Sequence, residues 1–140
     1  ISLRAPANWR SFPGSPPQVA TIAIGDGQIA IWRYPRSEPL PVTRSQLDAA
    51  RKALVAQVER RDATFRLTSS RLVVKHGLRA VELVGQGTNH GVRRSVRSLH
   101  AYGFGQEVVL DAFAPPQAFA RVDEQTFGPV ARSLRLRAPK

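Results

Sequence analysis

The 140-residue chain contains no cysteine, which excludes disulfide frameworks, thiolate metal sites and cysteine nucleophiles. It also lacks any apolar run approaching the ~18 residues that a membrane-spanning helix requires. Acidic residues are scarce, since 10 Asp and Glu stand against 21 Lys and Arg, and the formal net charge is +11. Such a balance favours an anionic partner, whether nucleic acid, a lipid head group or an acidic protein.

The positive charge also has a compositional explanation. The basic residues are spread from Arg4 to Lys140 rather than gathered in one block. Arginine outnumbers lysine 18 to 3, a bias that a GC-rich coding region tends to produce. We therefore favour the compositional explanation over specific nucleic-acid binding.

Length and composition predict a single globular domain over residues 1–140. With 42% hydrophobic and 22% charged residues, the chain can form a core without disulfides or metals. Residues 1–18 contain four prolines and are expected to form an irregular lead-in, with a short edge strand at Ile1–Arg4 as an option. Trp9 and Phe12 are expected to dock on the body of the domain.

A hairpin and a helix are predicted next. The β-prone runs Val19–Ile24 and Gln28–Tyr34 flank Gly25-Asp26-Gly27, whose residues tolerate the positive φ of a tight turn. A helix is expected at about 45–60, where apolar residues recur every three or four positions. Thr43 and Gln46 fit a capping box at its start. The members of its apolar stripe are Leu47, Ala50, Leu54 and Val58.

The second half of the chain predicts an antiparallel meander followed by helix. Its four strands are expected at Phe65–Lys75, Leu78–Val84, Val92–Tyr102 and Gln106–Phe113. The segment GQGTNHG at 85–91 is interpreted as a flexible hairpin loop. It lacks G-x-G-x-x-G spacing and precedes a strand, unlike a phosphate loop. A short helix near 116–122 and further helical turns within 124–132 are expected, interrupted by Gly128-Pro129.

This order of elements, with the segments LRAPANW, EVVLDAFAP, the following AF and TFGPVARSLRL, resembles the PsbP-like superfamily. Members include the PsbP subunit of photosystem II, a Ran-binding nuclear-import factor and LpqN-type bacterial envelope lipoproteins. The resemblance covers nearly the whole chain and concerns core positions, so it assigns no functional residue. It implies an α+β fold and a binding role rather than catalysis. The expected fold is a curved antiparallel sheet of about six to seven strands, with one long helix and a C-terminal helical segment packed on it.

Two catalytic or metal-binding constellations can be assembled from the sequence. The histidines His76, His90 and His100 could supply three zinc ligands, but they lack close spacing, so exposed or structural histidines are favoured and no metal site is expected. Ser95 or Ser98 with His100 and Asp111 could form a hydrolytic triad, which geometry rather than composition defines. Without a G-x-S-x-G elbow, this small-hydrolase hypothesis is a remote alternative.

Residues 93–103, RRSVRSLHAYG, combine three arginines with a histidine and a tyrosine. If the following turn is centred on Phe104, Arg97 faces Asp111 across the strand pair, and Arg93 and Arg97 point outward. A shift of one residue would exchange the two faces. On this register one face carries Arg93, Ser95, Arg97 and Asp111, and the other carries Val96, Val108, Leu110 and Ala112.

Binders of single-stranded nucleic acid combine outward cations of this kind with exposed stacking aromatics. The candidate binding surface of the chain therefore contains Arg93, Arg94, Arg97, Tyr102, Trp32 and Tyr34. A nucleic-acid-binding module using Arg93, Arg94 and Arg97 is the alternative function.

The leading hypothesis is a non-catalytic binding domain of an exported protein in the bacterial cell envelope. We expect attachment to the membrane only through a lipid-anchored segment upstream of Ile1, and no enzymatic activity or cofactor. The domain would present a sheet face, or a cleft beside the helix, to a protein, lipid or glycolipid partner of anionic character.

Overall fold

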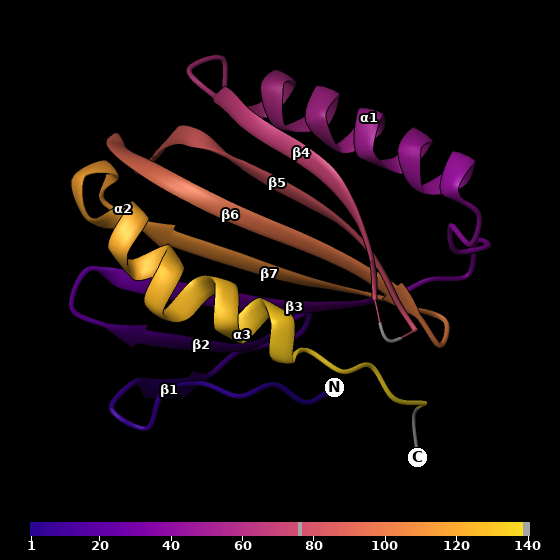
Figure 1. Cartoon of the computed structure of the whole chain (residues 1–140), viewed down its shortest axis with the longest axis horizontal. Helices are drawn as coiled ribbons and strands as arrows, with labels where there is room; N and C mark the ends of the chain where they lie inside the picture. The colour runs from indigo at the N-terminus through magenta and orange to yellow at the C-terminus, as the bar shows by residue number, and fades with distance from the viewer. Residues whose placement is uncertain (76, 139–140) are drawn as a thin grey trace.

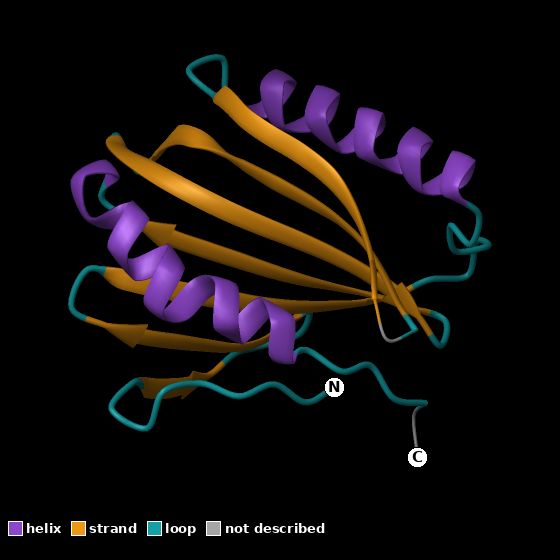
Figure 2. Cartoon of the chain, in the orientation of Figure 1, coloured by secondary structure: helices purple, strands orange, loops and turns teal. Residues whose placement is uncertain are grey.

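The computed structural model describes residues 1–75 and 77–138. It has one antiparallel sheet of seven strands in the order β1-β2-β3-β7-β6-β5-β4, one long helix and a C-terminal helical segment (Figures 1 and 2). The α+β fold expected from the sequence is therefore confirmed. The strands are β1 (Arg10–Pro13), β2 (Gln18–Ile24), β3 (Gly27–Pro35), β4 (Arg66–Lys75), β5 (Leu78–Asn89), β6 (Val92–Gly103) and β7 (Gln106–Ala114). The helical elements are α1 (Arg44–Arg61), α2 (Pro116–Val122), the π-helical turn η1 (Asp123–Phe127) and α3 (Gly128–Ser133).

The lead-in differs in part from the expectation. Ile1–Arg4 forms no strand, and Ser2 makes only an isolated bridge with Arg135. The outermost strand on this side is β1, which pairs with β2. Trp9 does dock on the body, with its ring 6.2 Å from that of Phe127 in an edge-on arrangement. Phe12 does not, since it is 50% exposed on the edge strand.

The β6–β7 turn corrects the predicted register by one residue. Its two loop residues, Phe104 and Gly105, both have positive φ, 52° and 70°, as a two-residue type I′ hairpin requires. The turn is therefore centred between them rather than on Phe104. Ser98 consequently pairs with Asp111, and Arg97 pairs with Ala112. The shift exchanges the faces of the β6 side chains relative to those of β7, so Val96 shares a face with Asp111 and Arg97 shares one with Ala112.

Strand β5 runs through most of the segment interpreted as a loop. The hairpin turn consists of His90 and Gly91, with φ of 50° and 76°. Gly85 and Gly87 lie inside the strand, at positions where the Phe65 ring approaches its backbone closely. A Cβ atom at Gly85 would lie 2.5 Å from Cζ of the Phe65 ring, and one at Gly87 would lie 2.7 Å from Oδ2 of Asp62. These glycines serve close packing rather than flexibility.

The two faces of the sheet are covered unequally. The closed face packs against the α2–α3 segment, which crosses the sheet in Figure 1. The open face lies on the side of α1, which contacts only β4 and β5 closely. The closed-face core consists of Ile22, Ile29, Ile31, Ala80, Leu99, Ala101, Val108, Leu110, Ala112, Ala114, Phe127, Val130 and Leu134. The α1 core is smaller, and its buried members are Leu47, Val81 and Leu83.

Helix α1 begins with the predicted capping box. The Thr43 side chain accepts a hydrogen bond from the Gln46 backbone at 3.1 Å, and Gln46 Oε1 accepts one from the Thr43 N–H at 3.1 Å. Leu47 is the one residue of α1 that is fully buried. The rest of the apolar stripe is half-buried, because part of it extends beyond β5 over a hollow.

The C-terminal segment is a single helical run rather than two separated pieces. The π-helical turn η1 joins α2 to α3 without a break, so Gly128-Pro129 does not interrupt it. Pro129, which has no N–H to donate, directly follows the π-helical turn, in which the Gly128 N–H bonds to the Asp123 carbonyl. No helix among the described residues combines the length and apolar character needed to cross a bilayer.

Candidate functional site: a cleft under helix α1

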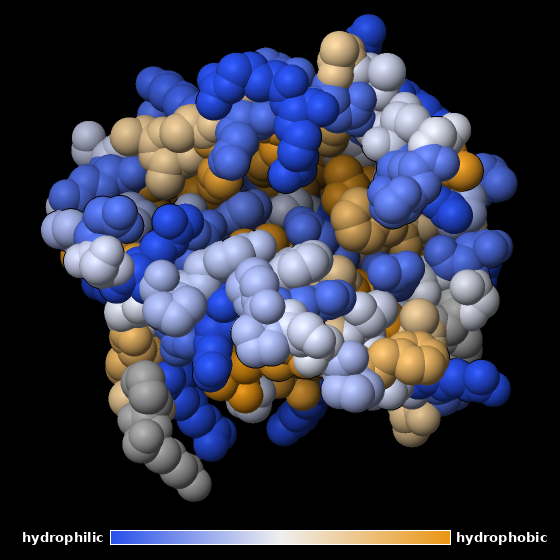
Figure 3. All heavy atoms as spheres, turned by 180° about the vertical axis from the view of Figure 1, so that it is seen from behind, coloured by the Kyte–Doolittle hydropathy of each residue, from blue (hydrophilic) through white to orange (hydrophobic). Residues whose placement is uncertain are grey.

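A cleft of about 650 Å³ lies between α1 and the open face of the sheet. This volume is within the range of small-molecule sites. Seen from behind, the molecule shows apolar side chains in a hollow between polar bands (Figure 3). The apolar lining consists of Leu54, Val58, Phe65, Leu83, Val96, Val109 and Phe113. The ionisable lining consists of Tyr34, Arg36, Arg61, Asp62, Arg94, His100, Glu107 and Asp111.

The floor of the cleft carries a continuous polar array. The Ser98 hydroxyl lies 2.6 Å from Oδ1 of Asp111 and 3.1 Å from Nε2 of His100. Nδ1 of His100 lies 2.7 Å from Oε1 of Glu107. The Arg36 guanidinium then pairs with Glu107 Oε2. The corrected register brings these residues together because Ser98 faces Asp111 and His100 lies diagonally opposite Glu107.

Glu107 is only 3% exposed, so its charge requires compensation. Burial by itself would raise the pKa of this carboxyl. The hydrogen bonds from His100 and Arg36 outweigh that effect, so the pKa of Glu107 is below its ordinary value. Glu107 is thus a buried carboxylate held between two donors.

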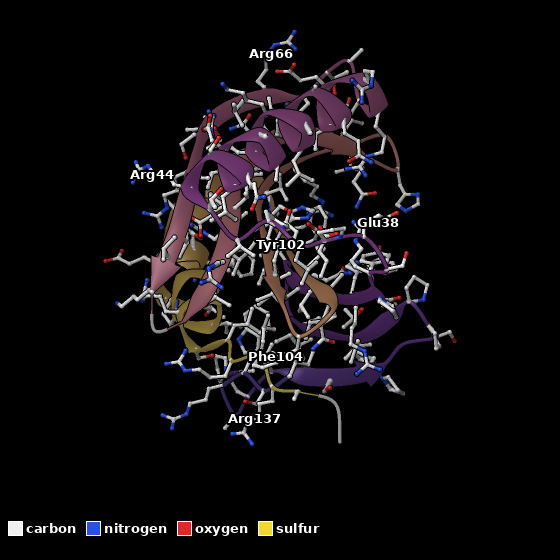
Figure 4. The ribbon with its side chains drawn as sticks, turned by 90° about the vertical axis from the view of Figure 1, so that its right-hand side faces the viewer. Glu38, Arg44, Arg66, Tyr102, Phe104 and Arg137 are labelled. Atoms are coloured by element: carbon white, nitrogen blue, oxygen red, sulfur yellow. The ribbon has the colours of Figure 1, made fainter. Side chains whose placement is uncertain are left out.

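The two tyrosines belong to the same side of the sheet. Burial, with the nearby Glu107 charge, raises the pKa of Tyr102, and its ring packs against the α1 core. Figure 4 shows Tyr102 in the interior, between α1 and the sheet. Burial and the charges of Asp111 and Glu107 raise the pKa of Tyr34 as well. Tyr34 lines the cleft and stacks on Trp32, with ring centroids 6.5 Å apart and an interplanar angle of 11°.

Two arginines lie at the end of the cleft where α1 finishes. Arg61 comes from the last turn of α1, and Arg94 projects from the start of β6. Both line the cleft. Asp62 beside them accepts hydrogen bonds from Thr64 and Thr88, which lower the pKa of its carboxyl. Among the described residues, neither arginine forms a salt bridge with a carboxylate.

The three predicted arginines do not form one surface. Arg97 lies on the closed face, where it forms a bidentate pair with Asp123 at 2.6 and 2.7 Å. It also contacts Glu82 at 2.6 Å, and these two carboxylates raise its pKa. The prediction that Arg97 points outward is therefore wrong. Arg93 is exposed and donates to the Thr64 carbonyl at 2.9 Å, while Arg94 faces the cleft.

The histidines do not support a metal site within the described part of the chain. His76 lies outside the described residues. His90 is exposed in the β5–β6 turn, and His100 is on the cleft floor. Across residues 1–75 and 77–138, no group of three or more His, Asp or Glu side chains could hold a metal ion.

The suggested triad is partly realised, with a different acid. Ser98, His100 and Glu107 are connected in the order nucleophile, base and orienting acid at hydrogen-bond distances. Asp111 contacts Ser98 instead of His100, and Ser95 is on the closed face. Sequence reasoning missed Glu107 and Arg36. The correct turn type would have placed Glu107 beside His100.

Comparisons with known proteins identify the architecture. No family model matches the chain, and no curated protein matches it. Among solved structures, PsbP (CyanoP) from Synechocystis sp. PCC 6803 has a TM-score of 0.69 at 14% identity, covering 94% of this chain and 84% of its own. The chain adopts the PsbP-like fold.

Two further structures share this PsbP-like fold. PA94, a protein of unknown function from Pseudomonas aeruginosa, gives a TM-score of 0.68 at 15% identity, covering 97% of this chain and 86% of its own. LpqN, involved in cell envelope biogenesis of Mycobacterium tuberculosis, gives 0.65 at 17% identity, covering 94% and 79%. The resemblance seen in the sequence is therefore confirmed at the level of fold.

Proposed function

We propose that this PsbP-like domain is a non-catalytic binding domain whose ligand is an anionic amphiphile held in the cleft under α1. The observation that carries this proposal is the division of the cleft lining. Leu54, Val96 and Phe113 offer an apolar wall, while Arg61 and Arg94 supply cations without carboxylate partners among the described residues. Pockets of this kind bind an apolar body and orient it through a few polar groups.

Charge complementarity selects an anion for the Arg61–Arg94 end. Arg94 is half-buried, so a guanidinium there gains more from an anionic partner than one in open water does. The third arginine of the cleft, Arg36, already pairs with Glu107. A cationic ligand would instead face two unpaired arginines.

We also propose that the domain works outside the cytoplasm, in the cell envelope, attached through a segment upstream of Ile1. The support is the shared fold with LpqN, which is involved in cell envelope biogenesis. Sequencing the precursor tests the location. An N-terminal export signal is expected, and a precursor without one would contradict the proposal.

Binding is tested with decane-1-sulfonate below its micelle concentration, measured by isothermal titration calorimetry. Saturable binding is expected, and Arg94→Gln should weaken it about tenfold, since the loss of one charge contact is worth about 1.4 kcal/mol. Arg79→Gln, an exposed arginine of β5 outside the cleft lining, is the matched control and should leave affinity unchanged. Absence of saturable binding, or equal weakening by both substitutions, would contradict the proposal.

The contact between Ser98 and His100 favours a hydrolase as a second candidate function. Two features oppose it. Asp111, at 2.6 Å from the hydroxyl, would repel the negative charge of a tetrahedral intermediate. Ser98 also lies inside β6, whose backbone pairs with both β5 and β7, so the strand offers no free N–H as an oxyanion donor there.

The hydrolase candidate is tested by His100→Ala in an esterase and phosphatase screen. Our proposal predicts that the variant and the parent chain show the same background rate. A rate that falls by about 100-fold or more in the variant, the size expected for a general base, would establish catalysis instead.

The nucleic-acid alternative requires the predicted arginines to lie on one surface. Arg97 and Arg94 instead lie on opposite faces of the sheet. Phosphate-driven binding by other arginines would still decline steeply with salt. Titration with single-stranded DNA at low salt tests it, and our proposal predicts no saturable binding.

A further inference from the structure

The polar array on the cleft floor contains three consecutive hydrogen-bonded contacts. They join Asp111 to Ser98 at 2.6 Å, Ser98 to His100 at 3.1 Å, and His100 to Glu107 at 2.7 Å. Ser98 is 9% exposed and Glu107 is 3% exposed. Each contact is a hydrogen bond only if one proton lies between its two heavy atoms, so the array requires three protons.

The ordinary protonation states of these four side chains supply fewer than three protons. A serine hydroxyl carries one proton, a neutral imidazole carries one, and an ionised carboxylate carries none. With Asp111 and Glu107 both ionised and His100 neutral, two protons must serve three contacts. One contact would then bring two lone pairs together at hydrogen-bond distance, which is unfavourable.

The third proton has two possible sources. A second imidazole N–H makes His100 cationic, and Ser98 then accepts from His100 and donates to Asp111. Alternatively, a protonated Asp111 donates to Ser98, and Ser98 donates to His100. Glu107 is not a source, because Arg36 also donates to it and keeps it ionised. The two arrangements differ by a shift of protons along the array, so the proton belongs to the coupled set.

We infer from these three contacts that the ligand-free domain holds the additional proton, and that the proton strengthens binding of an anion in the cleft. The second part rests on the proposed function. Without the proton, the charged groups lining the cleft cancel, and with it the cleft has a net positive charge. These groups are Arg61 at the end of α1 and the following Asp62, Arg94 and His100 of β6, Glu107 and Asp111 of β7, and Arg36 directly after β3, with Tyr34 neutral.

The substitution Asp111→Asn tests whether the additional proton is needed to satisfy the three contacts. An asparagine amide keeps the shape of the carboxyl group but donates a permanent N–H to Ser98. Ser98 can then donate to neutral His100, which donates to Glu107, so all three contacts are satisfied without an additional proton. The variant also has the net cleft charge of the protonated parent.

The first measurement concerns the free, full-length chain and needs no ligand. Imidazole nitrogen NMR and the Asp111 carboxyl carbon signal are followed between about pH 6 and about pH 9, with exposed His90 as the internal reference. At pH 7 the parent chain should show two protonated His100 nitrogens or a protonated Asp111. In Asp111→Asn, only one His100 nitrogen should be protonated. A neutral imidazole beside an ionised Asp111 in the parent chain would overturn the inference.

The second measurement is the affinity for decane-1-sulfonate, which remains an anion throughout that range. In the parent chain, affinity should fall about tenfold as the array loses its proton at high pH, the effect of one charge at a distance of about 10 Å. Asp111→Asn should bind as tightly as the protonated parent and show little pH dependence. Ser95→Ala, on the closed face of the same strand, is the matched control and should follow the parent.

The two failures are distinguishable. Absence of decane-1-sulfonate binding at every pH contradicts the proposed function, while the NMR result still decides whether the proton is present. Saturable binding with equal pH dependence in the parent chain and Asp111→Asn overturns the coupling between proton and ligand.

Discussion

The two faces of this sheet use buried charge in opposite ways. On the closed face, Arg97 joins Glu82 of β5 and Asp123 of the C-terminal helical segment. On the open face, His100 joins Glu107 and Asp111 is linked through Ser98, but α1 covers only part of the sheet. The first network therefore ties a helix to the sheet. The second lines a cleft and faces whatever enters it.

The two faces differ in chemistry because helices cover them to different extents. The closed-face core includes Leu110, Phe127 and Leu134, each no more than 3% exposed. The cavity beside the Arg97 network has a volume of about 220 Å³, against about 650 Å³ for the cleft under α1. Helix α1 is displaced toward β4 and β5, so Val109 and Phe113 of β7 line a hollow instead of packing under a helix. The larger packed core and the open cleft thus lie on different faces of one sheet.

The largest expected effect is loss of the closed-face core. Phe127→Ala should lower the free energy of unfolding by about 3–5 kcal/mol, because the ring is buried against Trp9 and Phe119. Urea denaturation measures it. Phe12→Ala removes the same ring from an exposed position and should cost less than about 1 kcal/mol. Equal losses would show that the two phenylalanines are not distinguished by burial.

A smaller loss is expected from the closed-face ion pair. Asp123→Asn should cost about 2–3 kcal/mol, because it leaves Arg97 with half its partners in a poorly solvated site. Asp48→Asn, which breaks a more exposed pair with Arg51 within α1, is the control and should cost clearly less, because solvent screens an exposed ion pair. Similar thermal and urea stabilities for both variants would argue against a structural role for the Arg97 network.

Truncation at the cleft wall should cost less stability than truncation in the closed core. Leu54→Ala is expected to lower the free energy of unfolding by about 1–2 kcal/mol, since Leu54 is only half-buried. It should also weaken decane-1-sulfonate binding, measured by calorimetry. A stability loss matching that of Phe127→Ala, with affinity unchanged, would mean that the cleft wall is part of the core.

The smallest expected difference is an acid effect on the open face. The pKa of Glu107 is lower in the folded chain than its ordinary value of 4.5. Its contribution to stability is therefore present above that ordinary value and is lost as pH falls through the folded pKa. Urea denaturation from neutral to acidic pH should show a shallower decline for Glu107→Gln than for the parent chain. Parallel declines would contradict the role of Glu107.

Local patterns predicted most of the elements. The helix at 45–60 extends over Arg44–Arg61 with the expected capping box, and the strands expected after it are all present. The errors concern positions where one residue changes the result. The sequence does not distinguish a turn centred on Phe104 from one centred on the bond after it. The choice between them decides whether Arg97 or Ser98 faces Asp111.

The sequence predicted the candidate site less completely than it predicted the fold. Tyr34 and Arg94 were named as candidates and do line the cleft, whereas Arg97 and Tyr102 serve packing on different faces. Glu107 and Arg36 gave no local signal, because their partnership joins residues 71 positions apart. Only strand pairing reveals such a contact.

By itself, the sequence determined the alternation of apolar residues, the turn-forming glycines and the helix cap, since these depend on neighbours within a few residues. The tertiary structure decided which strand residues meet, which face α1 leaves uncovered, and how many protons the floor of the cleft must hold. The reason is physical: side-chain direction in a strand reverses with every residue, so the chemistry of each face depends on a register that long-range pairing sets.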